Sequence, residues 1–203
     1  MKRVIVATKN KGKKEEIREL FKDYFDEFIS IDELDKEINI IENGNSFEEN
    51  AFIKAKVIYD LFHMPTLADD SGLMVDLLNG EPGIYSARYA GEDSNDKKNM
   101  EKLLDKLRDT PENNRTAKFV CVFVFIDENG NILKSRGECH GKIAFEPKGN
   151  NGFGYDPIFI PYGFDKTFAE LSDNVKNSIS HRFNAAIKLK KLLEELYEDF
   201  SNQ

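Results

Sequence analysis

Short apolar runs and helices with one apolar face alternate along the first part of the chain. Residues 4–7, Val-Ile-Val-Ala, predict a buried strand that opens into the polar turn Thr8-Lys9-Asn10-Lys11-Gly12. From Lys13 onward, apolar side chains recur at helical spacing, at Ile17, Leu20, Phe21 and Phe25. This order predicts a strand, a tight turn and an amphipathic helix.

A second helix is expected after a less regular acidic stretch, residues 29–45, which ends in the turn signal Glu42-Asn43-Gly44-Asn45. Ser46 is a suitable N-cap, and Glu49 stands at the N3 position of a capping box. The helix behind them is expected to point four apolar side chains toward the core: Phe47, Ala51, Ala55 and Ile58.

The rest of the chain mixes further strands and helices. Residues 65–68 predict a strand that feeds the loop Asp69-Asp70-Ser71-Gly72, residues 119–126 and 132–139 predict a hairpin, and residues 158–160 predict one more strand. An amphipathic helix is expected over residues 95–107 and a last helix from about Ser180. Without a repeat or a low-complexity tract, this order indicates an α/β or α+β fold with a mixed sheet.

Composition narrows the class of protein. With 203 residues, a single domain over residues 1–203 is expected, of ordinary size or built of two small lobes that share a core. A net charge of -8 argues against a protein that binds nucleic acid by general phosphate neutralisation. The longest apolar run, residues 119–126, is far shorter than the roughly 20 residues of a membrane-spanning helix, and no signal peptide is recognisable. Cys121 and Cys139 are expected to be core thiols, and the cytoplasm is the expected location.

The first candidate site is the turn between the first strand and helix. It has neither the spacing of a Walker A loop nor a Gly-x-Gly-x-x-Gly motif, but backbone N–H groups at a helix N-terminus attract anions. Lys11, Lys13 and Lys14 crowd this end, where the helix dipole disfavours cations. Either a bound anion relieves the conflict, or Glu15 and Glu16 balance a solvated basic turn.

Adjacent carboxylates at Asp69 and Asp70 form the second candidate. Oxygen ligands of this kind suit Mg²⁺, which also takes water and substrate phosphates, and Glu42 is a possible further ligand. The alternative is an acidic turn that caps a helix at residues 73–75. One helical turn separates Asn50 and Lys54, which either face a phosphate chain or face solvent.

Two later motifs are further candidates, and the first of them suits a planar base. In Gly152-Phe153-Gly154-Tyr155-Asp156-Pro157, glycines allow close approach, aromatic rings offer a stacking surface, and Asp156 can accept a hydrogen bond from a ring N–H. The alternative is a tight turn whose aromatics seal the core. Ser180-His181-Arg182, with Lys176 before it, places cations at a second helix start.

Taken in order, these motifs resemble one family. They are Thr8-x-Asn10-x-x-Lys13-x-x-Glu16, Ser46-Phe47-x-Glu49-Asn50-Ala51-x-x-Lys54-Ala55, Ala68-Asp69-Asp70-Ser71-Gly72-Leu73, Pro82-Gly83-Ile84-Tyr85-Ser86-Ala87-Arg88, Gly152-Phe153-Gly154-Tyr155-Asp156-Pro157 and Ser180-His181-Arg182. The chain resembles the inosine/xanthosine triphosphate pyrophosphatases, which clear deaminated purine nucleotides from the nucleotide pool. The resemblance runs from the first strand to the last helix.

The resemblance implies an α/β fold with a long mixed central sheet, two lobes with the active-site cleft between them, and a homodimer. It also implies Mg²⁺-dependent hydrolysis of dITP, ITP or XTP to the monophosphate and pyrophosphate. Asp70 is implied as general base, and Asp70, Asp69 and Glu42 as metal ligands, although relatives carry two glutamates where this chain has Ile41-Glu42. The implied substrate contacts are Thr8, Lys9, Asn10, Lys11, Gly12, Lys13, Lys54, Ser71, Phe153, Gly154, Tyr155, Asp156, Lys176, His181 and Arg182.

These parts predict a reaction in which water attacks the α-phosphorus, Asp70 takes its proton, and Lys13 and Lys54 neutralise the leaving pyrophosphate. Buried N–H donors facing a 6-keto oxygen would reject adenine. Two alternatives stay open: a house-cleaning pyrophosphatase for pyrimidine or modified nucleotides, and a nucleotide sensor without turnover. A repair factor that binds nucleic acid would need a basic stripe, and the chain has only scattered lysines.

Overall fold

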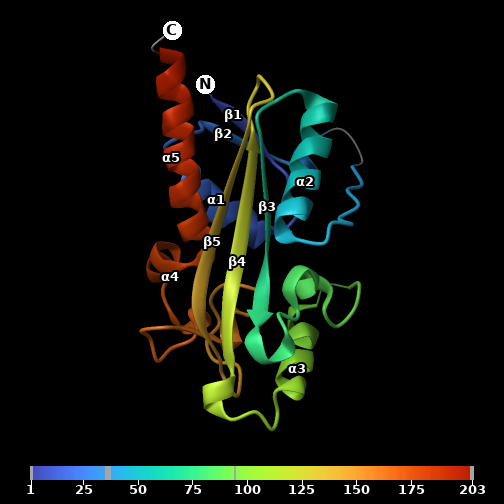
Figure 1. Ribbon diagram of the computed structural model, residues 1–203, viewed down its shortest axis with the longest axis vertical. Coiled ribbons are helices and arrows are strands. Elements are labelled where there is room, and N and C mark those ends of the chain that lie inside the picture. Colours follow the sequence, from blue (N-terminus) through green and yellow to red (C-terminus); the bar gives the residue numbers. More distant parts are fainter. Residues whose placement is uncertain (1, 35–37, 94, 202–203) are drawn as a thin grey trace. The chain divides into compact units, whose positions relative to one another are not determined.

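The computed structural model describes residues 2–34, 38–93 and 95–201, with side chains up to Tyr197 in the last range. Its six strands form one sheet in the order β2-β1-β3-β4-β5-β6 (Figure 1). β1 pairs in parallel with β2 and β3, while β5 and β6 are antiparallel, so the expected mixed sheet is confirmed. The strands are β1 (Arg3–Val6), β2 (Glu27–Ser30), β3 (Thr66–Val75), β4 (Thr116–Ile126), β5 (Ile132–Ile143) and β6 (Phe159–Pro161).

The helices begin at the polar residues that the sequence offers as caps. Side chains of Asn10, Ser46 and Asn95 each accept a hydrogen bond from the backbone N–H three residues later. Glu49 bonds the N–H of Asn45 rather than that of Ser46, so the predicted N-cap is confirmed without its reciprocal bond. The α-helices are α1 (Lys11–Phe21), α2 (Phe47–Phe62), α3 (Asp96–Lys106), α4 (Asp173–Ile179) and α5 (His181–Ser201), and a 3-10 turn, η3, covers Gly83–Arg88.

The chain divides into two compact units. Unit 1 comprises Met1–Asp70, Cys121–Gly137 and Arg182–Gln203, and unit 2 comprises Ser71–Val120 and Glu138–His181. β3, β4 and β5 each contribute residues to both. That residues 1–203 act as a single domain stays a prediction.

Unit 1 has its core between the strands and two helices that are far apart in sequence. Alternate residues of β1, Val4 and Val6, pack with apolar side chains of α1, β4 and α5. In Figure 1, α2 lies on the other side of these strands from α1 and α5. The core side chains contributed by the helices are Ile17, Leu20, Phe21, Ala185, Ala186, Leu189 and Leu193.

Unit 2 has a separate apolar core, rich in aromatic rings. Phe119 on β4 lies 4.7 Å, ring to ring, from Phe159 and 6.0 Å from Phe168. Leu103 of α3 and Tyr155 belong to the same cluster. Arg115 is buried here and donates to the backbone carbonyls of four residues: Leu107, Thr110, Ile143 and Ala144.

Three sequence interpretations need correction. The segment Asp69–Gly72 is not a loop, because β3 continues through it to Val75, and no helix follows at residues 73–75. α4 was missed, and with it the helical position of Lys176. β2 was also missed; it begins at Glu27 and extends only to Ser30, at the start of the acidic stretch 29–45, of which residues 35–37 lie outside the described residues.

Both cysteines are buried free thiols, as expected, one in each unit. Burial raises the pKa of Cys121 to about 12 and that of Cys139 to about 11, so neither thiol is reactive near neutral pH.

Candidate active site

The turn that opens α1 is held by its own side chains. Thr8 Oγ1 accepts from the N–H of Asn10, and Asn10 Oδ1 accepts from the N–H of Lys13. Lys9 and Lys11 are exposed, and Gly12 is half-buried. The first turn of α1 contains no acidic residue, so the predicted cationic helix start is confirmed.

Carboxylates from other elements balance the lysines of this turn. Lys13 Nζ lies 3.0 Å from Asp69 Oδ2 on β3, and Lys14 Nζ lies 3.3 Å from Glu33. Lys13 and Lys14 therefore have carboxylate partners outside α1, and Glu16 bonds Arg182. Burial of Asp69 acts to raise its pKa, but Lys13, Arg182 and Lys54 outweigh burial and hold this pKa well below its usual range.

Asp70 is held differently from its neighbour. Its Oδ1 is 3.1 Å from Lys54 Nζ, which also lies 2.9 Å from Glu42. Burial raises the pKa of Asp70, and the positive charge of Lys54 only partly opposes this shift. For Lys54, burial acts to lower the pKa, but the nearby carboxylates outweigh burial and raise it. Because Lys54 and Asn50 are both buried, a solvent-facing pair is excluded; Asn50 accepts from the N–H of Gly44.

Arg182 is buried next to Asp69, with 1 % of its surface exposed. Its guanidinium bonds Glu16 of α1 and lies 3.3 Å from Asp69 Oδ2. Burial acts to lower the pKa of Arg182, and Glu16 with Asp69 outweighs burial and raises it. The Arg182 guanidinium therefore binds two carboxylates of unit 1, those of Glu16 and Asp69. Glu16 and Arg182 are 166 positions apart, so no local sequence signal predicts this contact.

Two buried carboxylate oxygens here are available to a cation. Among the described residues, Asp69 Oδ1 and Asp70 Oδ2 have no hydrogen-bond partner. Such orphaned oxygens are costly unless a ligand or water satisfies them, so the donor set fits a divalent ion. In the described part of the chain, no three His, Cys, Asp or Glu side chains already form a cation site, and Glu42 is bound to Lys54.

In unit 2 the carboxylate of Asp156 stabilises the conformation of the glycine-rich loop, residues 152–157. Asp156 Oδ2 accepts from the N–H of Phe153 and lies 2.6 Å from Lys176 Nζ of α4. Gly152 has a φ of +74°, and a Cβ on it would meet Asp156 Oδ2 at 2.0 Å, so glycine is required at this position. Gly154 also has a positive φ, +62°.

Aromatic rings surround this ion pair. Lys176 Nζ lies 4.9 Å from the ring centroid of Phe153 and 5.9 Å from that of Phe168. His181 is buried and stacks on Phe119 at 4.7 Å. Tyr155 is buried and donates its hydroxyl to the carbonyl of Ser86. Burial of Tyr155 fits the alternative of a tight turn whose aromatics seal the core, while Phe153 stays half-buried.

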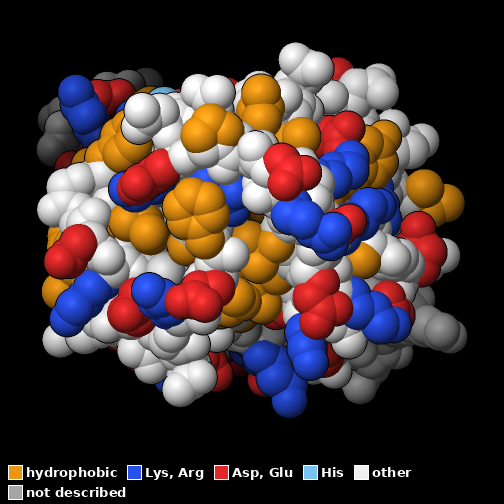
Figure 2. Space-filling view, turned by 90° about the horizontal axis from the view of Figure 1, so that it is seen from below, with side chains coloured by type: hydrophobic (Ala, Val, Ile, Leu, Met, Phe, Trp, Pro, Cys, Tyr) orange, Lys and Arg blue, Asp and Glu red, His pale blue; other side chains and the backbone are white. Residues whose placement is uncertain are grey.

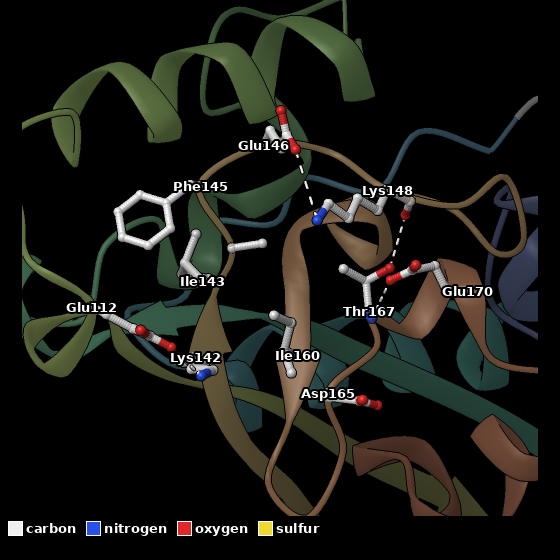
Figure 3. Close-up of a pocket in the computed structure, with 11 residues that line it drawn as sticks. Glu112, Lys142, Ile143, Phe145, Glu146, Lys148, Ile160, Asp165, Thr167 and Glu170 are labelled. Atoms are coloured by element: carbon white, nitrogen blue, oxygen red, sulfur yellow. Dashed lines mark hydrogen bonds and ion pairs between the residues drawn. The ribbon is translucent and has the colours of Figure 1, made fainter.

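A separate cavity of about 230 Å³ in unit 2 is lined by none of the predicted site residues. Figure 3 shows Lys148 joined to Glu146 and, through its carbonyl, to Thr167, with Ile160 and Phe145 nearby. In the view of Figure 2, charges of both signs are interspersed with hydrophobic side chains. No helix within the described residues is long and apolar enough to cross a membrane.

Comparison with known proteins places the chain in a protein family. The profile of the Ham1 family matches residues 4–192. A dITP/XTP pyrophosphatase of Oceanobacillus iheyensis is 49 % identical over 97 % of this chain and 100 % of its own length. Another, from Clostridium perfringens, is 45 % identical and covers 96 % of this chain and 98 % of its own length.

Solved structures support the same grouping. The Ham1 protein of Staphylococcus aureus superimposes with a TM-score of 0.85 at 45 % identity, covering 96 % of this chain and 99 % of that one. A nucleoside-triphosphatase and dITP/XTP pyrophosphatase of Mycobacterium abscessus gives 0.75 at 38 % identity, covering 92 % and 98 %. The expected fold class and family are therefore confirmed.

Proposed function

The chain belongs to the Ham1 family, and we propose that it hydrolyses dITP, ITP and XTP to the nucleoside monophosphate and pyrophosphate, so clearing deaminated purine nucleotides. Its similarity to named dITP/XTP pyrophosphatases over nearly the whole chain supports this. As substrates we propose purine nucleoside triphosphates, with neither nucleic acid nor membrane as partner.

The single observation that carries the proposal is the asymmetric hold on Asp70. Lys54 fixes Oδ1, while the buried Oδ2 has no hydrogen-bond partner among the described residues. A general base needs this arrangement, because one oxygen must be oriented and the other must be available to a water molecule. Asp69 differs from Asp70, because its Oδ2 forms ion pairs with both Lys13 and Arg182 and so holds these cations in place.

In the proposed reaction, Asp70 Oδ2 accepts the proton of a water molecule that attacks the α-phosphorus. Lys13 and Lys54 neutralise the charge that develops on the leaving pyrophosphate. Thr8, Lys9, Asn10, Lys11 and Gly12 supply backbone N–H groups and cations to the phosphate chain.

We propose Mg²⁺ as the cofactor, held by Asp70 with Asp69 and Glu42. When bound, the ion would polarise phosphate oxygens and neutralise their charge. Glu42 would have to exchange its contact with Lys54 for the ion, and Lys54 would then be released toward phosphate.

For the base we propose the residues of unit 2. Phe153 offers a ring face for stacking, and Gly154, Tyr155, Asp156 and Lys176 shape the polar edge. Ser71, His181 and Arg182 complete the proposed substrate contacts. Selection against adenine follows if N–H donors face the 6-keto oxygen, because an amino group there leaves buried donors unpaired.

The experiment that tests the function is pyrophosphate release with Mg²⁺ across dITP, ITP, XTP, GTP, ATP, dTTP and UTP. We expect rates for the first three far above the others. A preference for pyrimidines would move the chain to a different house-cleaning reaction, and tight binding without turnover would make it a sensor.

Asp70→Asn tests the assigned base within that reaction. The amide keeps the shape and loses the basic oxygen, so kcat should fall roughly 10²- to 10⁴-fold, with a smaller change in KM. The matched control is Asp60→Asn on α2, an exposed aspartate paired with Lys56. A normal kcat with normal Mg²⁺ dependence in Asp70→Asn would remove this residue from the role.

We also propose that the protein is a cytoplasmic homodimer. Its two cysteines are free, which is usual in a reducing compartment. Sedimentation equilibrium measures the oligomeric state directly, and a monomer at micromolar concentration would contradict the proposal.

A further inference from the structure

One hydrogen bond ties the glycine-rich loop of unit 2 to a helix that the proposed site does not include. Asp96, the first residue of α3, accepts a hydrogen bond through Oδ2 from the N–H of Gly154 at 2.8 Å. Resting on the proposed function, we propose that Asp96 is a positioning residue that fixes the base-binding loop and so sets nucleobase affinity.

The two successive N–H groups at the tip of the loop are both bonded to carboxylates. The N–H of Phe153 donates to Asp156 within the loop, and the N–H of Gly154 donates to Asp96, 58 positions earlier in the chain. Since Gly154 has a φ of +62°, its peptide can point away from the direction of its neighbour. The orientation of Phe153, which lies between these two bonds, is therefore defined from both sides.

Further contacts join the start of α3 to the same loop. Asn99, one turn into α3, is buried and bonds the carbonyl of Ala87 and the N–H of Ala90. Those residues follow Ser86, whose carbonyl accepts the hydroxyl proton of Tyr155. The first turn of α3 thus reaches the loop directly at Gly154 and through η3 at Tyr155. The Asp96 charge also contributes, after burial and Tyr89, to raising the pKa of Tyr155, which fits their proximity.

Asp96 does not act as a cap for its own helix. That role belongs to Asn95, whose side chain accepts from the N–H of Lys98. Asp96 is exposed, so its removal leaves no cavity in the core. Its effect on the loop can therefore be separated from an effect on folding, unlike that of the buried Asp156.

The test combines amide hydrogen exchange with steady-state kinetics on Asp96→Ala. Loss of a charged acceptor is expected to speed exchange at Gly154 and to raise KM for dITP roughly tenfold. The value of kcat should stay within about twofold, because the groups proposed for proton transfer and phosphate binding lie in unit 1. Asp96→Asn retains an acceptor oxygen and should restore most of the exchange protection and of the affinity.

Asp93→Ala is the matched control, because Asp93 precedes the same helix and pairs with Lys98 instead of the loop. It should change neither quantity. Unchanged exchange at Gly154 in Asp96→Ala, or faster exchange with an unchanged KM, would overturn the inference. The wild-type protein is assayed first: absence of dITP turnover there would contradict the proposed function, whereas normal turnover with an unaffected variant contradicts only the role of Asp96.

Discussion

Each unit buries one lysine at the proposed site, and the two lysines have different surroundings. Lys54 of unit 1 is 7 % exposed and contacts the carboxylates of Glu42 and Asp70. Lys176 of unit 2 is 3 % exposed and contacts the carboxylate of Asp156, with the rings of Phe153 and Phe168 close to its ammonium group.

The difference shows what each region is suited to bind. The carboxylates around Lys54 can exchange this cation for another one, which is what a phosphate chain with a divalent ion requires. The Lys176 ammonium is held in one place by a short ion pair and rings, which fixes the shape of a surface rather than its charge. This contrast supports the proposed assignment of the triphosphate to residues of unit 1 and of the base to residues of unit 2.

The largest effect is expected on breaking the charge balance of unit 1. Lys54→Met leaves Asp70 and Glu42 without their cation, and uncompensated buried charge costs about 3 kcal/mol of unfolding free energy. Urea denaturation measures the loss, and the labelling rate of Cys121 relative to Cys139 shows whether unit 1 opens first, since each unit holds one buried thiol.

Lys56→Met on the same helix provides the control. Lys56 is exposed and pairs with the exposed Asp60, so its loss should cost less than about 1 kcal/mol. Equal effects of the two substitutions, or equal acceleration of labelling at both cysteines, would show that the buried charges of unit 1 do not form a distinct region.

A smaller effect separates the two halves of the substrate. Phe153→Ala removes a stacking surface worth about 1–3 kcal/mol per base and should raise KM for dITP roughly tenfold. Inhibition by inorganic tripolyphosphate, which has no base, should stay unchanged. Lys13→Met should weaken tripolyphosphate inhibition, because Lys13 lies at the phosphate-binding turn of unit 1. If Phe153→Ala weakened tripolyphosphate as strongly as dITP, the division of labour would be wrong.

The smallest effect concerns the helices that carry the two lysines. Ser46 caps α2, which holds Lys54, and Ser172 caps α4, which holds Lys176. Ser46→Ala should cost about 1 kcal/mol. The Ser172 bond is longer, 3.4 Å against 3.1 Å, so Ser172→Ala should cost less. Chemical denaturation of the two variants measures the difference, and a larger loss in Ser172→Ala would contradict it.

The sequence predicted the elements whose signals are local. The N-cap at Ser46 and the apolar stripe of α1 depend on neighbours within a few positions, and both are confirmed, the stripe at Ile17, Leu20 and Phe21. Phe25, expected on the same stripe, lies beyond the end of α1. β3 was cut short at Ala68, because Asp69 and Asp70 are unfavourable in strands on propensity alone. Distant cations, Lys13, Arg182 and Lys54, stabilise these residues there.

The site was predictable in its residue types but not in its pairings. Nothing local joins Glu16 to Arg182, 166 positions apart, or Asp96 to Gly154. Such pairs form only when the sheet brings segments together, so periodicity cannot reveal them. Lys54 shows the same limit, because the sequence left open whether it faces a phosphate chain or solvent, and its partners Glu42 and Asp70 lie 12 and 16 positions away.

Unit 1 is built from three stretches of the chain, so it can be completed only late in synthesis. Its last stretch begins at Arg182, after both stretches of unit 2 have been made. Until translation passes this point, Asp69 of a nascent chain lacks its contact with Arg182. The apolar side chains of β1 likewise lack their packing against α5. Products that stop earlier expose the core of unit 1 and are expected to be removed by proteases before they can bind nucleotide.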